Sequence, residues 1–141
     1  MTLRRFQPIS RSGQWREQTA FRDPRTGALI DISQASLALA LYPCGERDTC
    51  WDYGWPLSAG ERPALSAETT ADNTGILRKL PDGVSVEWAF PQGQVAVLWP
   101  GSYLLIVTAT VADQTDEVLR EPIVVLPGGP RLTGSQPGSP R

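Results

Sequence analysis

The chain has 141 residues, 40% of them apolar, and a net charge of −2. This length suits one domain with its own core, and the apolar content excludes a disordered chain. Histidine is absent and Lys79 is the single lysine, so the usual general base at neutral pH and the commonest metal ligand are both missing. We therefore expect neither catalysis nor a cofactor. No apolar run approaches the roughly 20 residues of a membrane span, so no membrane partner is expected either.

The charges are unevenly distributed along the chain. Residues 1–25 hold six arginines against Glu17 and Asp23, which gives 6 − 2 = +4. Residues 26–126 hold five basic and thirteen acidic residues, which gives 5 − 13 = −8, and residues 127–141 add two arginines, or +2. A basic arm on an acidic body can attract neighbouring copies of the chain. The alternative is a solvated surface on which charges cluster by chance.

Residues 1–12 read as an extended basic arm. The segment opens with Met1-Thr2-Leu3-Arg4-Arg5 and no apolar stretch follows, so a secretory signal is not expected. Arginines interleaved with aromatic residues can bind nucleic acid, but the acidic body would repel it, so we expect no nucleic-acid partner. The arm residues that we assign to a protein interface are Arg4, Arg5, Phe6 and Arg11.

A first strand runs to Phe21, with Trp15 on the same face at period two. The stretch DPRTG that follows breaks this strand, because Pro24 has no N–H for a ladder and Gly27 accepts a positive φ at little cost. The apolar pattern restarts at residues 29–32. We predict a turn between two extended segments.

The segment SLALALY over residues 36–42 alternates strictly between leucine and alanine until it ends on Tyr42. Both residue types are good helix formers, so a helix is an alternative. The segment is short and ends at Pro43, and strict alternation favours a strand. We predict a strand whose leucines share one face and whose alanine face is packed or covered.

Residues 43–64 form a long loop rich in cysteine and tryptophan. A loop of this length is usually functional or inserted. Cys44 and Cys50 can close a disulfide if the backbone is paired there, whereas in reducing cytosol they would stay thiols. Two cysteines without histidine cannot complete a zinc site, so no metal is expected.

Three aromatic residues alternate within the same loop, at Trp51, Tyr53 and Trp55. On an extended segment they would share one face, and such surfaces anchor protein interfaces or stack on sugar rings. The alternative is that the rings fold back and cap the end of the domain. We include all three among the candidate interface residues.

The remaining apolar segments read as short strands separated by turns. They are ALSAETT at 64–70, ILRKL at 76–80, VSVEWAF at 84–90, QVAVLW at 94–99, SYLLIVTATV at 102–111 and VLREPIVVL at 118–126. The run at 102–111 is the longest, and its β-branched content favours a central strand. Pro122 indicates that the last strand lies at an edge or carries a bulge.

About seven to nine short strands with frequent turn signals, and no convincing helix, predict an antiparallel all-β sandwich or barrel. We place this β domain at residues 13–126. The tail at residues 127–141 is rich in proline and glycine and has little to bury, so it reads as an extended arm. Its Arg131 and Arg141 complete the candidate interface residues.

The order of these motifs resembles small bacteriophage tail and baseplate proteins, in particular the N-terminal domain of baseplate upper proteins. The motifs that carry the resemblance are Ser12-Gly13-Gln14-Trp15, Phe21, Asp23-Pro24-Arg25-Thr26-Gly27, Ile30-Asp31-Ile32-Ser33, Leu65-Ser66-Ala67, Val84–Phe90, Pro100-Gly101-Ser102-Tyr103 and Leu119–Val125. The resemblance covers about residues 8–127. It departs from the family at residues 43–64 and in the tail.

The resemblance implies an immunoglobulin-like β-sandwich with extended N- and C-terminal arms, no catalysis, and a structural place in a multi-copy baseplate or tail tip. The implied partners are other tail or baseplate proteins and copies of the chain itself in a symmetric assembly. The implied location is the virion, after synthesis in the bacterial host cytoplasm. The alternative function is a carbohydrate- or receptor-binding module, which would need Trp51, Tyr53 and Trp55 exposed as a platform.

Overall fold

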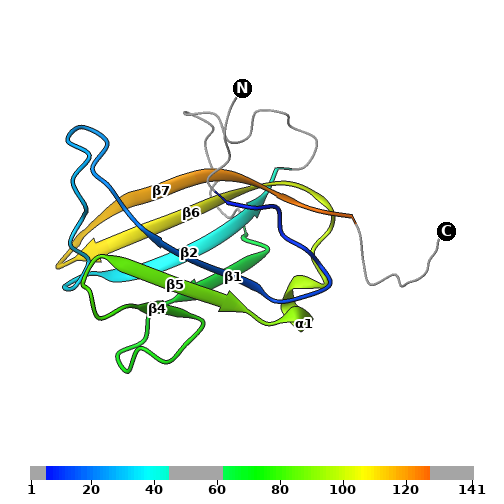
Figure 1. Cartoon of the computed structure of the whole chain (residues 1–141), viewed down its shortest axis with the longest axis horizontal. Coiled ribbons are helices and arrows are strands. Elements are labelled where there is room, and N and C mark those ends of the chain that lie inside the picture. The colour runs from blue at the N-terminus through cyan, green and yellow to red at the C-terminus, as the bar shows by residue number, and fades with distance from the viewer. Residues whose placement is uncertain (1–5, 45–61, 128–141) are drawn as a thin grey trace.

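The structure, a computed structural model, describes residues 6–44 and 62–127. Two antiparallel sheets face each other across one hydrophobic core (Figure 1). The elements in chain order are β1 (Trp15–Ala20), β2 (Ser36–Pro43), β3 (Leu65–Glu68), β4 (Leu77–Lys79), β5 (Ser85–Phe90), α1 (Gln92–Val95), β6 (Gly101–Val111) and β7 (Gln114–Val125). The all-β fold class predicted from the sequence is confirmed.

Three strands form one sheet in the order β1-β5-β4, and four form the other in the order β3-β2-β6-β7. Every pairing between these named strands is antiparallel. Period-two alternation points alternate side chains of each strand into the space between the sheets. Trp88 and Phe90 of β5 enter this core fully buried, as the pattern of that segment predicts.

The segment at 36–42 is a strand and not a helix. β2 pairs with β6 from Ser36 opposite Thr110 to Pro43 opposite Tyr103. Its leucines are at most 2% exposed. The alternation therefore predicted the element correctly against the helix propensity of its residues, because a strand buries all three leucines on one face.

The run at 102–111 is the central strand that its composition predicts. β6 lies between β2 and β7, and its Tyr103, Leu105 and Val107 belong to the main core. Leu104 and Ile106 point to the opposite face, where they form a second buried cluster with Cys44. Both faces of β6 are thus buried near its middle, which accounts for its nearly continuous apolar sequence.

The last strand lies at a sheet edge and carries an irregularity. Leu119 pairs with Val107 and Glu117 with Thr108, so Val118 is an extra residue on β7. Pro122, opposite Leu104, cannot donate a ladder hydrogen bond and is tolerated because β7 ends the sheet. A bulge, a proline and edge charges are common protections against unwanted strand pairing.

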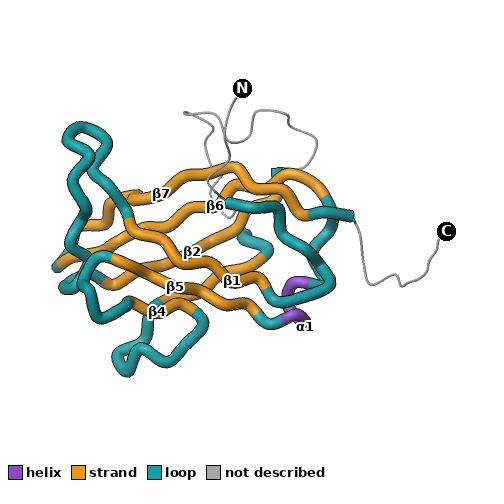
Figure 2. Tube along the Cα trace, viewed as in Figure 1, coloured by secondary structure: helices purple, strands orange, loops and turns teal. Residues whose placement is uncertain are grey.

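Two segments that read as strands are not strands. Residues 29–32 make a single isolated bridge, between Leu29 and Arg22, after a turn in which Gly27 adopts φ 76° as expected. Residues 94–99 begin in α1 and continue as a loop; Figure 2 marks α1 as the helix of the described chain. Val95 and Leu98 are both buried, and a spacing of three residues buries them in a helical turn but not in a strand.

The N-terminal boundary of the domain is also corrected. Phe6 and Ile9 are 5% and 1% exposed and belong to the main core. Ile9 forms a parallel bridge with Val125; its N–H donates to the carbonyl oxygen of Val124 at 2.7 Å, and its own carbonyl accepts from the N–H of Leu126 at 3.0 Å. Residues 6–12 are therefore part of the folded body. Residues 1–5 of the predicted arm lie outside the described residues.

Candidate protein-binding surface

Large apolar side chains are exposed at one end of the molecule, beside α1. Val97 is 73% exposed, Trp99 83% and Leu126 43%. Gly101 pairs with Val125, so the loop before β6 and the residue after β7 lie at the same end of the molecule. We call Val97, Trp99 and Leu126 the end surface. An exposed tryptophan is unusual for a side chain of this size and marks a candidate contact site.

The loop that carries the end surface is anchored to the body. Val95 and Leu98 are 0% and 3% exposed and alternate with the outward Val97 and Trp99. The hydroxyl of Tyr103 donates to the carbonyl oxygen of Trp99 at 2.7 Å. Partial burial of Tyr103 raises the pKa of its hydroxyl. The Tyr103 hydroxyl therefore stays protonated at neutral pH and can donate its hydrogen bond to the Trp99 carbonyl oxygen.

A second set of contacts ties the same loop to the segment before β1. The guanidinium of Arg11 donates through Nη2 to the carbonyl oxygen of Ala96 at 2.9 Å. The Gln92 side chain donates through Nε2 to the carbonyl oxygen of Arg11 at 3.2 Å. Together with the bond from Tyr103 to the Trp99 carbonyl, the Arg11 bond to Ala96 fixes the backbone on both sides of Val97. The exposed side chains therefore project from an ordered support.

The opposite end of the molecule is acidic. A cavity of about 460 Å³ lies between the 23–31 turn and the β6–β7 connection. Its lining includes the acidic residues Asp23, Asp31, Asp116 and Glu117 and one basic residue, Arg25, which pairs with Asp23 at 3.7 Å, together with Val111, which is 51% exposed. Hydrogen bonds from the Ser33 hydroxyl and backbone N–H lower the pKa of Asp31, so this carboxylate stays ionised. The two ends thus differ in chemistry, one apolar and one negatively charged.

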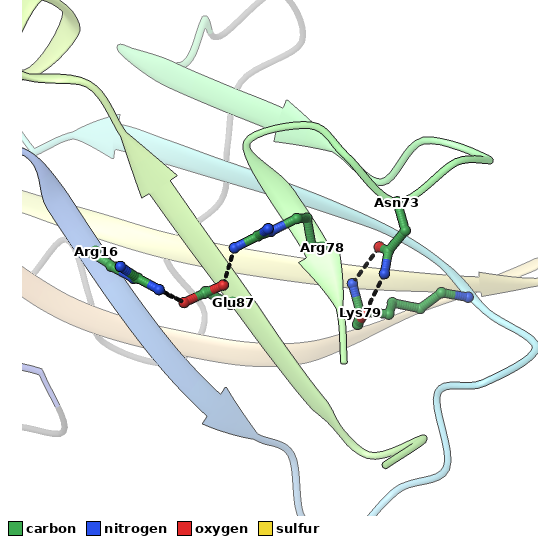
Figure 3. Close-up of polar contacts among 5 residues, drawn as sticks. All are labelled: Arg16, Asn73, Arg78, Lys79 and Glu87. Carbon is green, nitrogen blue, oxygen red and sulfur yellow. Dashed lines mark hydrogen bonds and ion pairs between the residues drawn. The ribbon is translucent and has the colours of Figure 1, made fainter. Parts of the chain in front are cut away.

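A buried carboxylate links the three strands of the smaller sheet on its outer face (Figure 3). The side chain of Glu87 on β5 is 8% exposed and lies between Arg16 of β1 and Arg78 of β4. Arg16 Nε donates to Glu87 Oε2 at 2.8 Å, and Arg78 Nη2 contacts Oε1. The hydrogen bond from Arg16, followed by the charges of both arginines, lowers the pKa of Glu87 although burial opposes the shift. Glu87 therefore joins three strands as an anion at neutral pH and is unsuited to act as a general acid there.

The single lysine also has a structural role. Nζ of Lys79 donates to the carbonyl oxygens of Ser33 at 3.1 Å and Ala35 at 2.8 Å. The backbone N–H of Lys79 donates to the Asn73 side chain at 2.7 Å, and that side chain also contacts the Lys79 carbonyl (Figure 3). These bonds connect β4 in one sheet with the segment that leads into β2 in the other. A cavity of about 500 Å³ borders the contacts, and the ammonium group is already used by backbone oxygens.

The predicted site residues have different outcomes. Phe6, predicted to lie at an interface, is instead in the core, where its ring centroid lies 5.6 Å from that of Trp88; a ring so enclosed by the body cannot contact a partner. Arg11 is half-buried and bonded to the backbone. Cys44 is 4% exposed and takes part in a disulfide, while its predicted partner Cys50 lies outside the described residues. The other candidates that lie outside them are Arg4, Arg5, Trp51, Tyr53, Trp55, Arg131 and Arg141.

Trp99 and Val97 are the exposed residues that the sequence pattern did not identify. Residues 94–99 were expected to form a strand, and in a strand Val97 and Trp99 would share a face with Val95. The spacing of Val95 and Leu98 and the following Pro100-Gly101 turn indicate a helical turn and a loop instead. Recognising that turn would have placed the tryptophan on the outside.

Within residues 6–44 and 62–127, no group of three or more His, Cys, Asp or Glu side chains is arranged to hold a metal ion. In the same part of the chain, no helix is long and apolar enough to cross a membrane. No protein-family model, curated protein or solved structure matches this chain.

Proposed function

We propose that this chain is a structural attachment protein of a bacteriophage or prophage-derived tail, located in the virion at the baseplate or tail tip. It acts by binding other tail proteins and copies of itself, and it performs no catalysis. The motif resemblance over about residues 8–127 supports this proposal. The two-sheet frame supports it as well, because loops at the ends of a stiff β domain can bind neighbours without disturbing the core.

The finer fold that we propose is an immunoglobulin-like β-sandwich. Four strands facing three matches the strand count of a constant-type immunoglobulin domain, although β2 lies here in the sheet with β3 and β6 and not beside β1 and β5. Loops of such a domain cluster at its two ends, which is where the apolar and acidic surfaces of this chain lie. Repetition of the domain by symmetry would turn contacts of modest strength into a stable ring.

The exposure of Trp99 is the observation that carries the attachment function. Tryptophan is among the residues that contribute most to binding energy when an interface buries them. Its loop is already held by Tyr103 and Arg11, so little conformational entropy is lost when a partner binds. A side chain 83% exposed on an ordered loop adds little to the stability of the isolated chain, which favours a role in binding.

The test is to locate the chain on particles and then remove Trp99. An antibody against the folded chain should label purified phage particles at the tail end in electron micrographs. In particles grown with substituted chains, Trp99→Ala should lower incorporation at least about tenfold, whereas Leu29→Ala, an exposed apolar residue at the opposite end, should not. Particles without label would overturn the proposal.

A carbohydrate-binding module is the second candidate, because a free indole face can also stack on a sugar ring. A glycan array separates the two candidates. Binding to defined glycans that disappears in Trp99→Ala, in a protein that does not label particles, would favour the sugar-binding function over attachment.

A further inference from the structure

The tail contains a short repeat that its proline and glycine content hides. Pro127-Gly128-Gly129-Pro130-Arg131 and Pro137-Gly138-Ser139-Pro140-Arg141 follow the same pattern, P-G-x-P-R, ten residues apart. A polyproline II helix has three residues per turn, so the two prolines of each repeat would share one face. Each repeat thus offers two proline rings followed by a guanidinium group.

This chemistry fits an exposed tryptophan. Proline-rich segments bind surfaces lined by aromatic rings, because the extended segment is already ordered and loses little entropy. A guanidinium group also stacks favourably on an indole face. Trp99, at the same end of the molecule as the exposed Val97 and Leu126, provides such a face at 83% exposure. We propose that the tail of one copy of this chain binds the end surface of another copy.

The tail leaves the body at the end that carries Trp99, and its length allows it to reach a second copy. β7 ends at Val125, and Leu126 donates its N–H to the carbonyl oxygen of Ile9. The tail therefore begins at this end of the molecule, and its second repeat lies ten residues beyond the first, far enough along the chain to bind the end surface of a second copy. Residues 128–141 extended as polyproline II span roughly 43 Å at about 3.1 Å per residue, enough to reach a neighbour.

Charge assists the same contact. The tail carries Arg131 and Arg141, whereas residues 1–126 of the neighbour carry eleven basic and fifteen acidic residues, a net of 11 − 15 = −4. The attraction steers the tail toward the other copy and weakens as salt is added. Because tail and end surface are different parts of the chain, the contact is heterologous, and repetition produces a ring where the rotation closes. This inference rests on the proposed function, since both use the end surface for attachment.

The experiment measures self-association of the full-length chain by sedimentation over a concentration series. The wild-type chain should associate, and both Trp99→Ala and the double variant Pro130→Ala with Pro140→Ala should weaken association by about tenfold or more. Leu29→Ala is the matched control and should associate like the wild type. Each variant is first checked for an unchanged thermal midpoint, which the exposure of Trp99 leads us to expect.

Mixing the two defective variants distinguishes a contact between tail and end surface from a contact between two end surfaces. The Trp99→Ala chain keeps an intact tail and the proline variant keeps an intact end surface, so an equimolar mixture should form a heterodimer that neither forms alone. Association of the proline variant by itself would show a contact between two end surfaces and overturn the inference. A wild-type chain that stays monomeric at every concentration would overturn it too. Antibody labelling of particles tests the proposed function separately, so either can fail alone.

Discussion

Replacing Phe6 by alanine tests whether the residues before β1 belong to the folded body. Phe6 is 5% exposed and its ring meets Trp88 edge-on at 5.6 Å between centroids. Removing a buried phenylalanine side chain costs about 3–5 kcal/mol, and the aromatic pair accounts for about 0.5–1.5 kcal/mol of this. Phe6 lies before β1 and outside the named strands, where the backbone can partly refill the space. We therefore expect the lower end of the range, about 3 kcal/mol.

Ile9→Ala extends the same test to the strand-like contact with β7. Ile9 is 1% exposed and lies between two backbone hydrogen bonds, to Val124 and from Leu126. Shortening the side chain should lower the free energy of unfolding by about 2–4 kcal/mol while leaving these bonds in place. A loss at both positions would show that the segment packs as a unit.

Equilibrium urea unfolding followed by circular dichroism, under non-reducing conditions, measures both losses. The urea concentration at the unfolding midpoint should fall. The dependence of the unfolding free energy on urea concentration should not change, because the surface exposed on unfolding stays almost the same. Leu29→Ala, at a residue that is 45% exposed, is the control and should change stability by less than about 0.5 kcal/mol. A Phe6→Ala loss no larger than that of Leu29→Ala would refute the packing of this segment and restore a free arm over residues 1–12.

Three further predictions concern strain, charge and the tail. Ala112 adopts φ 55° in the β6–β7 turn, where a Cβ is unfavourable, so Ala112→Gly should raise stability by up to about 1 kcal/mol in the same urea assay; a loss would show that the turn is unstrained. The pKa of Glu87 lies below its ordinary value of 4.5 in the folded chain, so its contribution is present above that value and lost as pH falls through the lowered folded pKa. The urea midpoint of the wild type should therefore fall more steeply below about pH 5 than that of Glu87→Gln, and parallel curves would contradict the ion pairs. Deleting residues 128–141 should leave the thermal midpoint nearly unchanged and lower incorporation into particles; an unfolded truncated chain would show that the tail belongs to the core.

The local sequence pattern was sufficient to predict the strands in which apolar and other residues alternate. Leu37, Leu39 and Leu41 bury one face of β2, and the same alternation places Trp88 and Phe90 in the core. The sequence also predicted the turn at Gly27, because only a residue that tolerates a positive φ fits that turn at little cost. These features depend on neighbours within a few residues, so the sequence alone was sufficient to predict them.

Contacts between distant parts of the chain were decided only by the tertiary structure. Ile9 pairs with Val125, more than a hundred residues later, and no local period signals such a parallel contact. Glu87 occupies an outward position that reads as solvated, yet Arg16 and Arg78 from two other strands enclose it. The exposure of Trp99 likewise depends on which side of the 94–99 loop faces the core. A side chain's local spacing sets its direction, but what it meets there depends on the packing of the whole chain.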